Sequence, residues 1–216
     1  MYKKIKKFVF RTFWPIYAFY YLILHPQSYL RTTGWLRSLR KGFPNNLDGS
    51  SVPWMNYSVV KFLEEKLTND LSIFEFGSGY STLFFAKRVK KVVSVEYDED
   101  WILKMKEHLP ENVEVIFQEY DVDGAYCKVI GTSNQKFDIV IVDGRDRVNC
   151  IKQSLNALSN DGVLILDDSQ RAYYTEGIQF MKEKGFRLLT FEGLKPEGFF
   201  LDQSIVFYRD DNCLNI

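Results

Sequence analysis

A short stretch near residue 75 combines a carboxylate with two glycines. It has the sequence EFGSG, with Glu75 two positions before Gly77 and Gly79 two positions after it. Glycine lets the backbone turn sharply and approach a ligand where a Cβ atom would collide. A carboxylate beside this turn suits a cationic group and would repel a pyrophosphate. We therefore expect the turn to hold a ligand whose nearest group is positively charged.

A second carboxylate ends the next β-branched run. Glu96 follows the run 92–95, VVSV, and lies 19 positions after Gly77. A carboxylate at this place can accept hydrogen bonds from both hydroxyls of a ribose, and the helix that begins after the turn has unpaired N–H groups that face the ligand. Thr82 stands where a dinucleotide-binding fold would prefer a third glycine. The pattern predicts a site for an adenosine-bearing ligand and favours S-adenosylmethionine (SAM) over a dinucleotide.

Three more acids follow two fully apolar runs. Asp143 comes directly after 137–142, and Asp167 and Asp168 come directly after 162–166. The carboxyl ends of parallel strands meet at one edge of a sheet, so the three carboxylates should converge there. Leaving them together without a cationic partner would be costly. The sequence therefore predicts a neutralised acidic group at this edge.

Two kinds of cation can neutralise the acids. Arg145, Arg147 and Arg171 are near in sequence, and a divalent ion such as Mg²⁺ prefers oxygen ligands. A metal would lower the pKa of a substrate hydroxyl and hold that hydroxyl in line with the group to be transferred. Without a metal, Asp143 or Asp167 can take the proton. The arginines can also clamp an acidic substituent of the substrate, such as a uronate or a phosphate.

Alternating strands and helices must position these residues. The segment 71–96 has the order strand, glycine turn, helix, strand, which is one right-handed βαβ unit. Apolar periodicity and turn residues continue the alternation along the chain. We expect further strands at 113–117, 137–142, 162–166, 186–191 and 203–208, and helices at 54–67, 82–89, 98–109, 148–158 and 173–184. The sequence thus predicts one α/β domain.

The motifs at 75–82 (EFGSGYST) and 95–98 (VEYD) resemble the first two motifs of class I SAM-dependent methyltransferases, and the resemblance covers about residues 53–208. It implies a doubly wound, Rossmann-like sheet of seven strands whose last strand is antiparallel. It also implies that Glu119 or Asp121 accepts a hydrogen bond from the adenine amino group. The residues that it implies for cofactor binding are Glu75, Phe76, Gly77, Ser78, Gly79, Ser81, Thr82, Glu96, Tyr97, Glu119, Asp121 and Asp143.

The aspartates carry a second resemblance. One Asp after the fourth strand and an Asp-Asp pair after the fifth are similar to the Mg²⁺ site of the macrocin- and novobiocin-type sugar O-methyltransferases. The catechol and caffeoyl-CoA O-methyltransferases have Asp-Asn, and Ser169 departs from that pattern. The resemblance implies metal-assisted methyl transfer from SAM to a hydroxyl of a sugar, a glycan or a related small molecule. The implied catalytic residues are Asp143, Asp167, Asp168, Arg145 and Arg147, with the three aspartates as metal ligands.

Three other functions remain open. An aminopropyltransferase of the spermidine-synthase type has the same fold and a related cofactor, but its acidic pocket would not suit three arginines. A dinucleotide oxidoreductase is disfavoured by Glu75 and Thr82. A non-catalytic, membrane-associated module that binds SAM or a nucleotide would keep the glycine turn and show no turnover.

Residues 1–50 differ from the rest of the chain. The basic residues at their start are Lys3, Lys4, Lys6, Lys7 and Arg11. The aromatic run 12–24 that follows has 13 residues and no charge, which is shorter than the roughly 20 residues of a spanning helix. Pro15 and the lack of a small-residue cleavage site argue against a signal peptide. Two interpretations stay open, namely peripheral contact with the cytoplasmic leaflet through residues 1–42, or packing of the aromatic residues on the domain or on a partner.

Composition narrows the remaining possibilities. The 216 residues suit one domain of residues 51–216 behind the extension 1–50, with the turn-rich segment 43–53 between them. Basic and acidic residues number 28 each, so no overall field favours nucleic acid. The three cysteines show neither a metal spacing nor a disulfide framework. These features indicate a cytoplasmic protein, with the inner face of the membrane as its second expected location.

Overall fold

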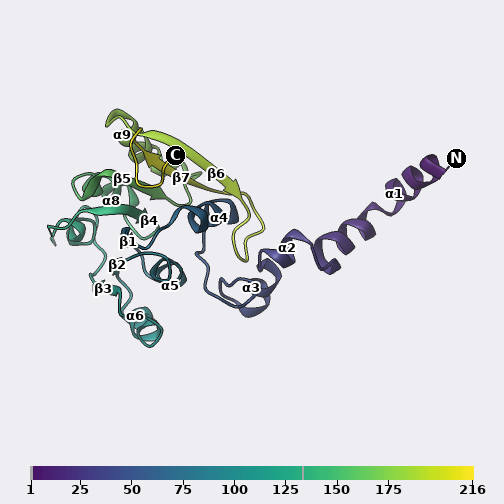
Figure 1. Cartoon of the computed structure of the whole chain (residues 1–216), viewed down its shortest axis with the longest axis horizontal. Coiled ribbons are helices and arrows are strands. Elements are labelled where there is room, and N and C mark those ends of the chain that lie inside the picture. The colour runs from purple at the N-terminus through teal and green to yellow at the C-terminus, as the bar shows by residue number, and fades with distance from the viewer. Residues whose placement is uncertain (1, 133) are drawn as a thin grey trace.

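The computed structural model describes residues 2–132 and 134–216, with the backbone alone for residues 2–9, and its central element is a seven-stranded sheet (Figure 1). The strands are β1 (Ser72–Phe76), β2 (Lys91–Glu96), β3 (Val113–Phe117), β4 (Phe137–Val142), β5 (Leu158–Leu166), β6 (Arg187–Gly193) and β7 (Asp202–Tyr208). Their order across the sheet is β3-β2-β1-β4-β5-β7-β6. β7 pairs antiparallel with both β5 and β6, whereas the pairs among β1 to β5 are parallel. The predicted doubly wound sheet with an antiparallel last strand is confirmed.

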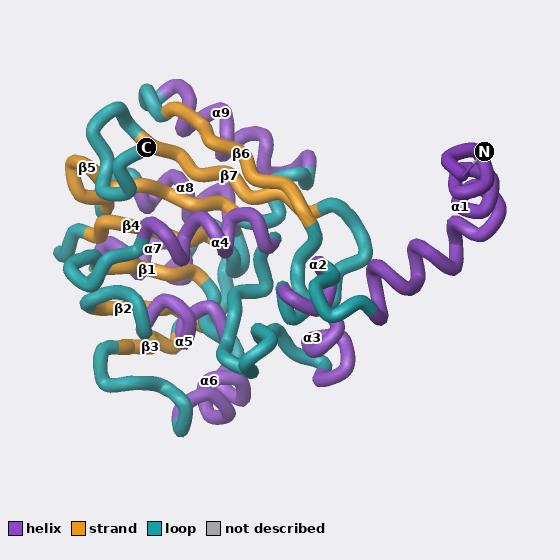
Figure 2. The backbone as a smooth tube through the Cα atoms, turned by 45° about the vertical axis from the view of Figure 1, so that its right-hand side comes forward, coloured by secondary structure: helices purple, strands orange, loops and turns teal. Residues whose placement is uncertain are grey.

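Helices cover both faces of this sheet (Figure 2). On one face lie α4 (Tyr57–Lys66) and α5 (Tyr80–Ala86), and on the other lie α7 (Ala125–Lys128), α8 (Arg147–Ser154) and α9 (Thr175–Glu183). The remaining elements are α6 (Glu99–Lys106) between β2 and β3, η2 (Val129–Gly131) and η3 (Ala172–Tyr174). Two hydrophobic clusters, one on each face, hold the helices to the sheet.

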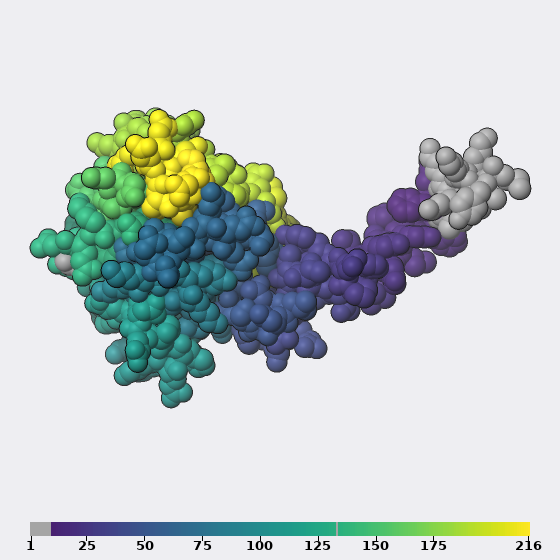
Figure 3. Space-filling view, in the orientation of Figure 1, coloured from purple at the N-terminus to yellow at the C-terminus, as the bar shows by residue number. Residues whose placement is uncertain are grey.

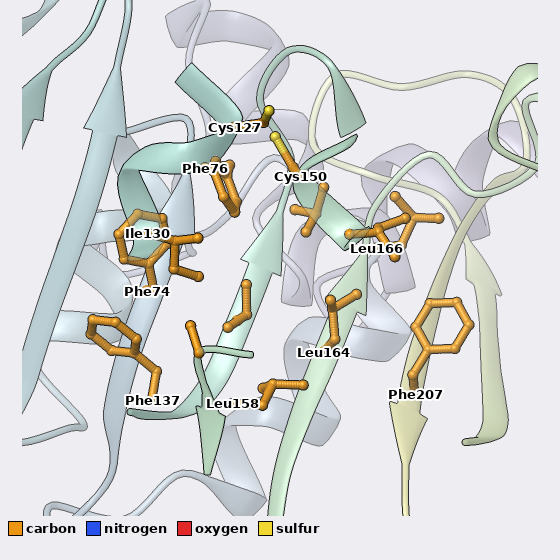
Figure 4. Packing of buried hydrophobic residues seen from close by; sticks show 14 of the residues in the cluster. Phe74, Phe76, Cys127, Ile130, Phe137, Cys150, Leu158, Leu164, Leu166 and Phe207 are labelled. Atoms are coloured by element: carbon orange, nitrogen blue, oxygen red, sulfur yellow. The ribbon is translucent and has the colours of Figure 1, made fainter. Parts of the chain in front are cut away.

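Side chains alternate along β1 between these two clusters. Phe74 and Phe76 pack with Phe137 and Ile130 in one cluster (Figure 4), and Ile73 lies in the other. Successive residues of a strand point to opposite faces. Glu75 therefore shares the face of Ile73, beneath α4 and α5, and this placement decides its role in the site.

The predicted helix 54–67 begins later than expected. Asn56 caps α4, because its side-chain oxygen accepts a hydrogen bond from Val59 N at 3.1 Å. The preceding residues, among them Trp54, are therefore outside the helix and free to line a cavity.

The extension consists of α1 (Tyr2–Phe19), η1 (Tyr20–Leu24), α2 (Tyr29–Thr32) and α3 (Trp35–Lys41). α1 projects from the body (Figure 1) and is kinked at Phe13, two residues before Pro15. In the space-filling view, residues 10–24 form a narrow arm beside the body (Figure 3). α3 packs on the domain instead, because Trp35 is only 6% exposed and its Nε1 donates to Gly198 O at 2.8 Å. In the described residues we find no helix with the length and apolar content needed to span a bilayer.

Candidate cofactor and acceptor site

A cleft of about 540 Å³ opens at the carboxyl ends of β1, β2 and β4. This is the edge at which open α/β sheets bind ligands. Its lining residues are Trp54, Gly77, Ser78, Gly79, Tyr80, Ser81, Glu96, Tyr97, Asp98, Trp101, Asp143, Gly144, Arg145 and Arg147. Nine of these lining positions were predicted as site residues from the sequence, namely Gly77, Ser78, Gly79, Ser81, Glu96, Tyr97, Asp143, Arg145 and Arg147.

Two glycines bring the loops after β1 and β4 together at the floor of the cleft. Gly77 has φ +92°, and a Cβ atom there would lie 3.1 Å from Gly144 Cα. A Cβ atom on Gly144 would lie 2.2 Å from Tyr126 Oη and 2.9 Å from Phe76 C. Gly79 differs from the sequence prediction, because its φ of 167° is extended backbone that does not require glycine. The close approach therefore depends on Gly77 and Gly144.

Glu96 ties the glycine turn to the end of β2. Its Oε2 accepts from Ser78 N at 2.9 Å, and its Oε1 accepts from Tyr97 N at 2.8 Å and Asp98 N at 3.0 Å. A carboxylate has about four acceptor positions, and the fourth is taken only by the long 3.4 Å contact from Ser78 Oγ. Because that hydroxyl can rotate away, a ligand hydroxyl can take its place. Glu96 is thus held in one orientation on the wall where the sequence predicts the ribose hydroxyls.

Glu75 does not reach the cleft, which corrects the prediction that it contacts the cofactor. Its exposed fraction is 0%, and its carboxylate accepts from the hydroxyls of Ser81, Thr82 and Ser94. The reason is the alternation along β1, which turns Glu75 toward α5 and opposite Ser94 of β2. Because Glu75 does not face the cleft, it gives no argument against the binding of a pyrophosphate there.

Phe76 and Thr82 are also buried away from the cleft, with exposed fractions of 0%. Phe76 packs in the hydrophobic core, and Thr82 Oγ1 accepts from Gly79 N at 2.9 Å. Both residues therefore support the turn from behind, and their predicted place among the cofactor contacts is wrong for the side chains.

Burial gives Glu75 an unusual titration. Burial raises the pKa of Glu75 to about 7, although the hydrogen bonds from its three hydroxyl partners work in the opposite direction. Because this folded-state pKa lies above the ordinary value, folding favours the protonated carboxyl. The stability that Glu75 contributes is present at low pH and is lost as the pH rises from about 4.5 to about 7.

Replacing Glu75 with a neutral isostere is expected to remove this pH dependence. The loss in the wild type is on the order of 3 kcal/mol in the free energy of unfolding between pH 5 and pH 8. Urea denaturation of the wild type and of Glu75→Gln at both pH values measures it. The variant should gain stability relative to the wild type at pH 8, and equal pH slopes in the two proteins would contradict the assignment.

The region beyond Glu96 is aromatic. Arg145 Nη2 donates to Tyr97 Oη at 2.8 Å, and the ring of Tyr120 lies 6.4 Å from that of Tyr97. On the other side of the turn, Trp101 Nε1 donates to Ser78 O at 2.9 Å. Flat apolar rings near the Glu96 carboxylate suit a planar base.

Glu119 and Asp121 lie outside the cleft lining, so neither predicted adenine contact is formed by this arrangement. Glu119 is exposed. The Asp121 carboxylate accepts from Ala125 N at 2.7 Å and Tyr126 N at 2.9 Å, and these N–H groups hold its pKa below the usual range. Asp121 therefore stabilises the start of α7.

The three predicted aspartates do converge. One carboxylate oxygen from each of Asp143, Asp167 and Asp168 lies within 4.8 Å of the others. Asp167 and Asp168 are 1% and 5% exposed, whereas the side chain of Asp143 is 27% exposed at the cleft. Asp143 is thus the member of the group that a substrate can reach.

Protein cations already neutralise this group. Arg147 Nη2 lies 2.9 Å from Asp143 Oδ1 and 3.4 Å from Asp168 Oδ2. Its other N–H groups donate to the carbonyl oxygens of Gly144, Asp167 and Asp143. Arg147 is 8% exposed, so its donors are used inside the protein, and its predicted role as a clamp for an acidic substrate is not supported. Arg147 positions the aspartates instead.

The other two predicted arginines separate. Arg171 Nη2 lies 2.7 Å from Asp168 Oδ2 and joins the acidic group. Arg145 contacts Tyr97 on the opposite side of the cleft, which corrects the prediction that it acts with Arg147. Two residues that are two positions apart need not share a face, and this pair does not.

Lys195 completes the group and was missed by the sequence reasoning. Its Nζ lies 2.9 Å from Asp168 Oδ1 and 3.1 Å from Asp202 Oδ2. Both β5 and β6 pair antiparallel with β7, so β6 ends at the same edge as β5. The loop after β6 therefore arrives beside the aspartates, and a lysine at the start of that loop was the signal that could have identified it.

The electrostatic environment differentiates the aspartates. Burial and the nearby Asp168, opposed by Arg147, raise the pKa of Asp143 to about 6. Burial, together with Asp143 and Asp202, raises the pKa of Asp167 well above its usual range. Burial also acts to raise the pKa of Asp168, but Lys195 and Arg147 outweigh it and hold that pKa low. Near neutral pH, Asp143 is therefore a carboxylate with the proton affinity of a general base.

A resident divalent metal does not fit this arrangement. The guanidinium of Arg147 bridges Asp143 and Asp168, where a metal shared by them would lie. Lys195 lies against the other oxygen of Asp168, and Asp167 Oδ1 accepts from Ser204 Oγ at 2.6 Å. A metal would have to displace these partners, so the protein's own side chains neutralise the aspartates.

Several lining residues lay outside the sequence predictions. Trp54 lines the cleft, and its Nε1 donates to Pro196 O at 2.9 Å. Tyr80, Asp98, Trp101 and Gly144 were not identified from the sequence. The loop after β4 had a detectable signal, because Gly144 directly follows Asp143.

Comparisons with known proteins agree with this geometry. A family model described as a methyltransferase domain matches residues 74–169. No curated protein matches the chain in sequence.

Three similar solved structures show the fold. The precorrin-6y C5,15-methyltransferase from Geobacter metallireducens has a TM-score of 0.51 and 13% identity, covering 69% of this chain and 86% of that one. A Streptococcus mutans protein assigned as a methyltransferase, in complex with SAH, has a TM-score of 0.52 and 16% identity, covering 69% and 94%. The precorrin 8w decarboxylase from Methanobacterium thermoautotrophicum has a TM-score of 0.52 and 19% identity, covering 78% and 97%. The chain therefore has the fold of the class I SAM-dependent methyltransferases.

Proposed function

We propose that this protein transfers the methyl group of SAM to a hydroxyl oxygen of a sugar, a glycan or a related small molecule. The observation that carries the proposal is that one cleft is lined by two carboxylates, one fixed by hydrogen bonds and the other with a raised pKa. Glu96 is locked by backbone N–H groups in a position for the ribose. Asp143 is exposed to the same cleft with a pKa raised to about 6.

The chain's own residues account for the proton and for the geometry. When bound, SAM would supply a methyl group whose C–S bond breaks with the electron pair remaining on sulfur, while a lone pair of the acceptor oxygen forms the new C–O bond. The acceptor hydroxyl gives its proton to the Asp143 carboxylate. Arg147 fixes Asp143 through the 2.9 Å contact, and Glu96 and the glycine turn fix the donor. Such a displacement is accelerated mainly by positioning.

Features of the acceptor side support a hydroxylated ring. Trp54 is 45% exposed and offers an apolar face in the cleft that also holds Asp143. Arg171 is partly exposed beside Asp168, and Arg145 is exposed in the cleft lining, so both remain accessible to an acidic substituent. An aminopropyltransferase would need free acids for a polyamine, whereas here Arg147, Arg171 and Lys195 neutralise them.

Transfer of label from SAM tests the reaction. Purified protein is incubated with methyl-labelled SAM and with the glycan and lipid fractions of the producing cell. Label is expected in a hydroxyl-bearing acceptor, and exhaustive EDTA treatment is expected to leave the rate unchanged because Arg147 and Lys195 hold the place of a metal. A rate that is lost with EDTA and restored by Mg²⁺ would establish the metal-assisted form instead.

Calorimetry with SAM and with NAD⁺ is the matching control. Binding of SAM and not of NAD⁺ is expected if the proposed methyl transfer is correct. SAM binding without transfer to any fraction would identify a binding module, and binding of NAD⁺ would favour an oxidoreductase.

A further inference from the structure

The projecting part of the extension exposes an apolar surface that the rest of the chain does not cover. Its helices α1 and η1 carry large apolar side chains that are between 38% and 65% exposed. These are Phe10, Phe13, Trp14, Ile16, Tyr17, Phe19, Tyr20, Tyr21, Leu22 and Leu24. We call them the projecting helix surface. Over the whole of α1, helical periodicity segregates the basic residues from the apolar ones, which is typical of a helix that lies in a membrane interface.

The charge of the chain is divided at the same place. Residues 1–47 contain nine of the 28 basic residues and none of the 28 acidic residues, the first acid being Asp48. Because the whole chain is neutral, residues 48–216 carry the opposite net charge. Basic residues flank the uncharged run 12–24 on both sides, at Arg11 and Arg31. This arrangement is complementary to anionic lipid headgroups above an apolar interior.

A second apolar patch lies at the end of the molecule where the extension joins the body. The tip of the loop between β6 and β7 contains Phe199, Phe200 and Leu201, which are 64%, 86% and 65% exposed. Trp35 holds this loop, with its ring 5.2 Å from that of Phe199. Figures 1 and 2 show the loop beside α2 and α3, from which the chain continues to α1. The projecting helix surface and the loop tip are thus joined through α3.

The same loop leads into the site. Lys195 pairs with Asp168, and Pro196 O accepts from Trp54 Nε1 in the cleft lining. Only a few residues separate these contacts from the exposed tip. A surface that receives the tip therefore lies next to the acceptor side of the cleft.

We propose that the projecting helix surface and the loop tip Phe199–Leu201 dock together on an anionic phospholipid bilayer, and that the acceptor hydroxyl belongs to a molecule carried by a lipid in that bilayer. The second part rests on the proposed methyl transfer. The uncharged run is too short to span, so the helix lies within the interface. Tyrosine and tryptophan, which are frequent in the run, are the residues enriched at that depth.

Vesicle sedimentation of the full-length protein tests the docking. The wild type is expected to bind vesicles of phosphatidylglycerol and phosphatidylcholine, and to bind pure phosphatidylcholine vesicles more weakly. Trp14→Glu is expected to reduce the partition coefficient about tenfold or more, and Phe200→Glu severalfold. Leu103→Glu is the matched control, because Leu103 is 61% exposed on α6 and the change adds the same charge to a surface outside the proposed contact.

The outcomes separate the bilayer from other occupants. Equal binding of Trp14→Glu and the wild type, or no binding by the wild type, would overturn the docking. A wild-type dimer in sedimentation velocity that Trp14→Glu dissociates, without vesicle binding, would assign the surface to a second copy. SAM affinity measured by calorimetry should be the same in the wild type and the three variants. A loss of vesicle binding can then be attributed to the docking surface and not to damage of the cofactor site.

The acceptor class has its own test. Methyl-labelled SAM is supplied with the organic-phase extract of the producing cell's membranes, reconstituted in vesicles, or with the water-soluble glycan fraction. Label is expected in the organic-phase extract, and Trp14→Glu should lose most of that transfer at unchanged SAM affinity. Label in the water-soluble fraction alone would overturn the lipid-carried acceptor, whereas no label in either fraction would count against the methyl transfer itself.

Discussion

Glu96→Ala is expected to weaken SAM binding by about 100-fold or more. The carboxylate is the proposed acceptor for the ribose hydroxyls, and a hydrogen bond to a charged group is worth about 1.5–3 kcal/mol. It also holds the N–H groups of Ser78, Tyr97 and Asp98, so its loss releases the glycine turn as well. Isothermal titration calorimetry with SAM measures the change.

Glu99→Ala is the control for this loss. Glu99 lies three residues further on, in the first turn of α6, and is not part of the cleft lining. Its replacement removes the same charge and should leave SAM affinity within about twofold. Unchanged affinity in Glu96→Ala would refute the placement of the ribose and with it the orientation of the donor.

Asp143→Asn is expected to lower kcat by about 10²–10⁴ while SAM affinity changes little. The substitution keeps the shape of the side chain and removes the proton acceptor, and general-base catalysis typically contributes a factor of this size. Arg147 and the buried Asp167 and Asp168 remain in place, so the structure around the acidic group is retained. Single-turnover methyl transfer and SAM calorimetry, measured on the same preparation, separate the two effects.

The pH profile provides a second signature of Asp143. A base must be deprotonated, and the pKa of Asp143 is raised to about 6 by burial and by Asp168. The wild-type rate should therefore be high above pH 6 and fall as the pH is lowered through about 6. The residual rate of Asp143→Asn should not show this inflection, whereas Asp138→Asn, at the other end of β4, should retain it. A variant at position 143 that loses SAM affinity as strongly as Glu96→Ala would reverse the two roles.

The strands could be predicted closely because each is a short apolar run between turn residues. β3 and β4 have the bounds expected from the sequence, and the order of the sheet agrees with the motif resemblance. Buried parallel strands carry their signal locally, since both faces need apolar side chains. Helix ends were less accurate, because the Asn56 cap and the packing of neighbours decide them.

The direction of Glu75 was in principle readable from the sequence. Phe74 and Phe76 flank it, and the period of two places it on the opposite face from both. Its partner Ser94, however, comes from the register of β1 with β2, which no local pattern specifies. The motif located the glycine turn correctly. The interpretation of Glu75 as a ligand contact placed its side chain on the wrong face of the strand.

The acidic group shows a similar division between local and distant information. The convergence of the three aspartates could be predicted, because they directly follow two parallel strands that end at the same edge of the sheet. Lys195 could not be placed in the same way, since it reaches Asp168 only through the pairing of β6 with β7. The choice between a metal and protein cations depends on that distant residue and on the side-chain geometry of Arg147.

The two tryptophans that hold the loop after β6 have a consequence for how the sequence of this protein can vary. Trp35 and Trp54 bind Gly198 and Pro196 through main-chain oxygens, and every amino acid supplies such an oxygen. Glu197 is the one position between them, and its φ of +62° is tolerated best by Gly, Asn and Asp. Replacements of these types can therefore alter what the loop selects while its course is retained. Libraries randomised there, with both indoles kept, are a direct route to altered acceptor preference.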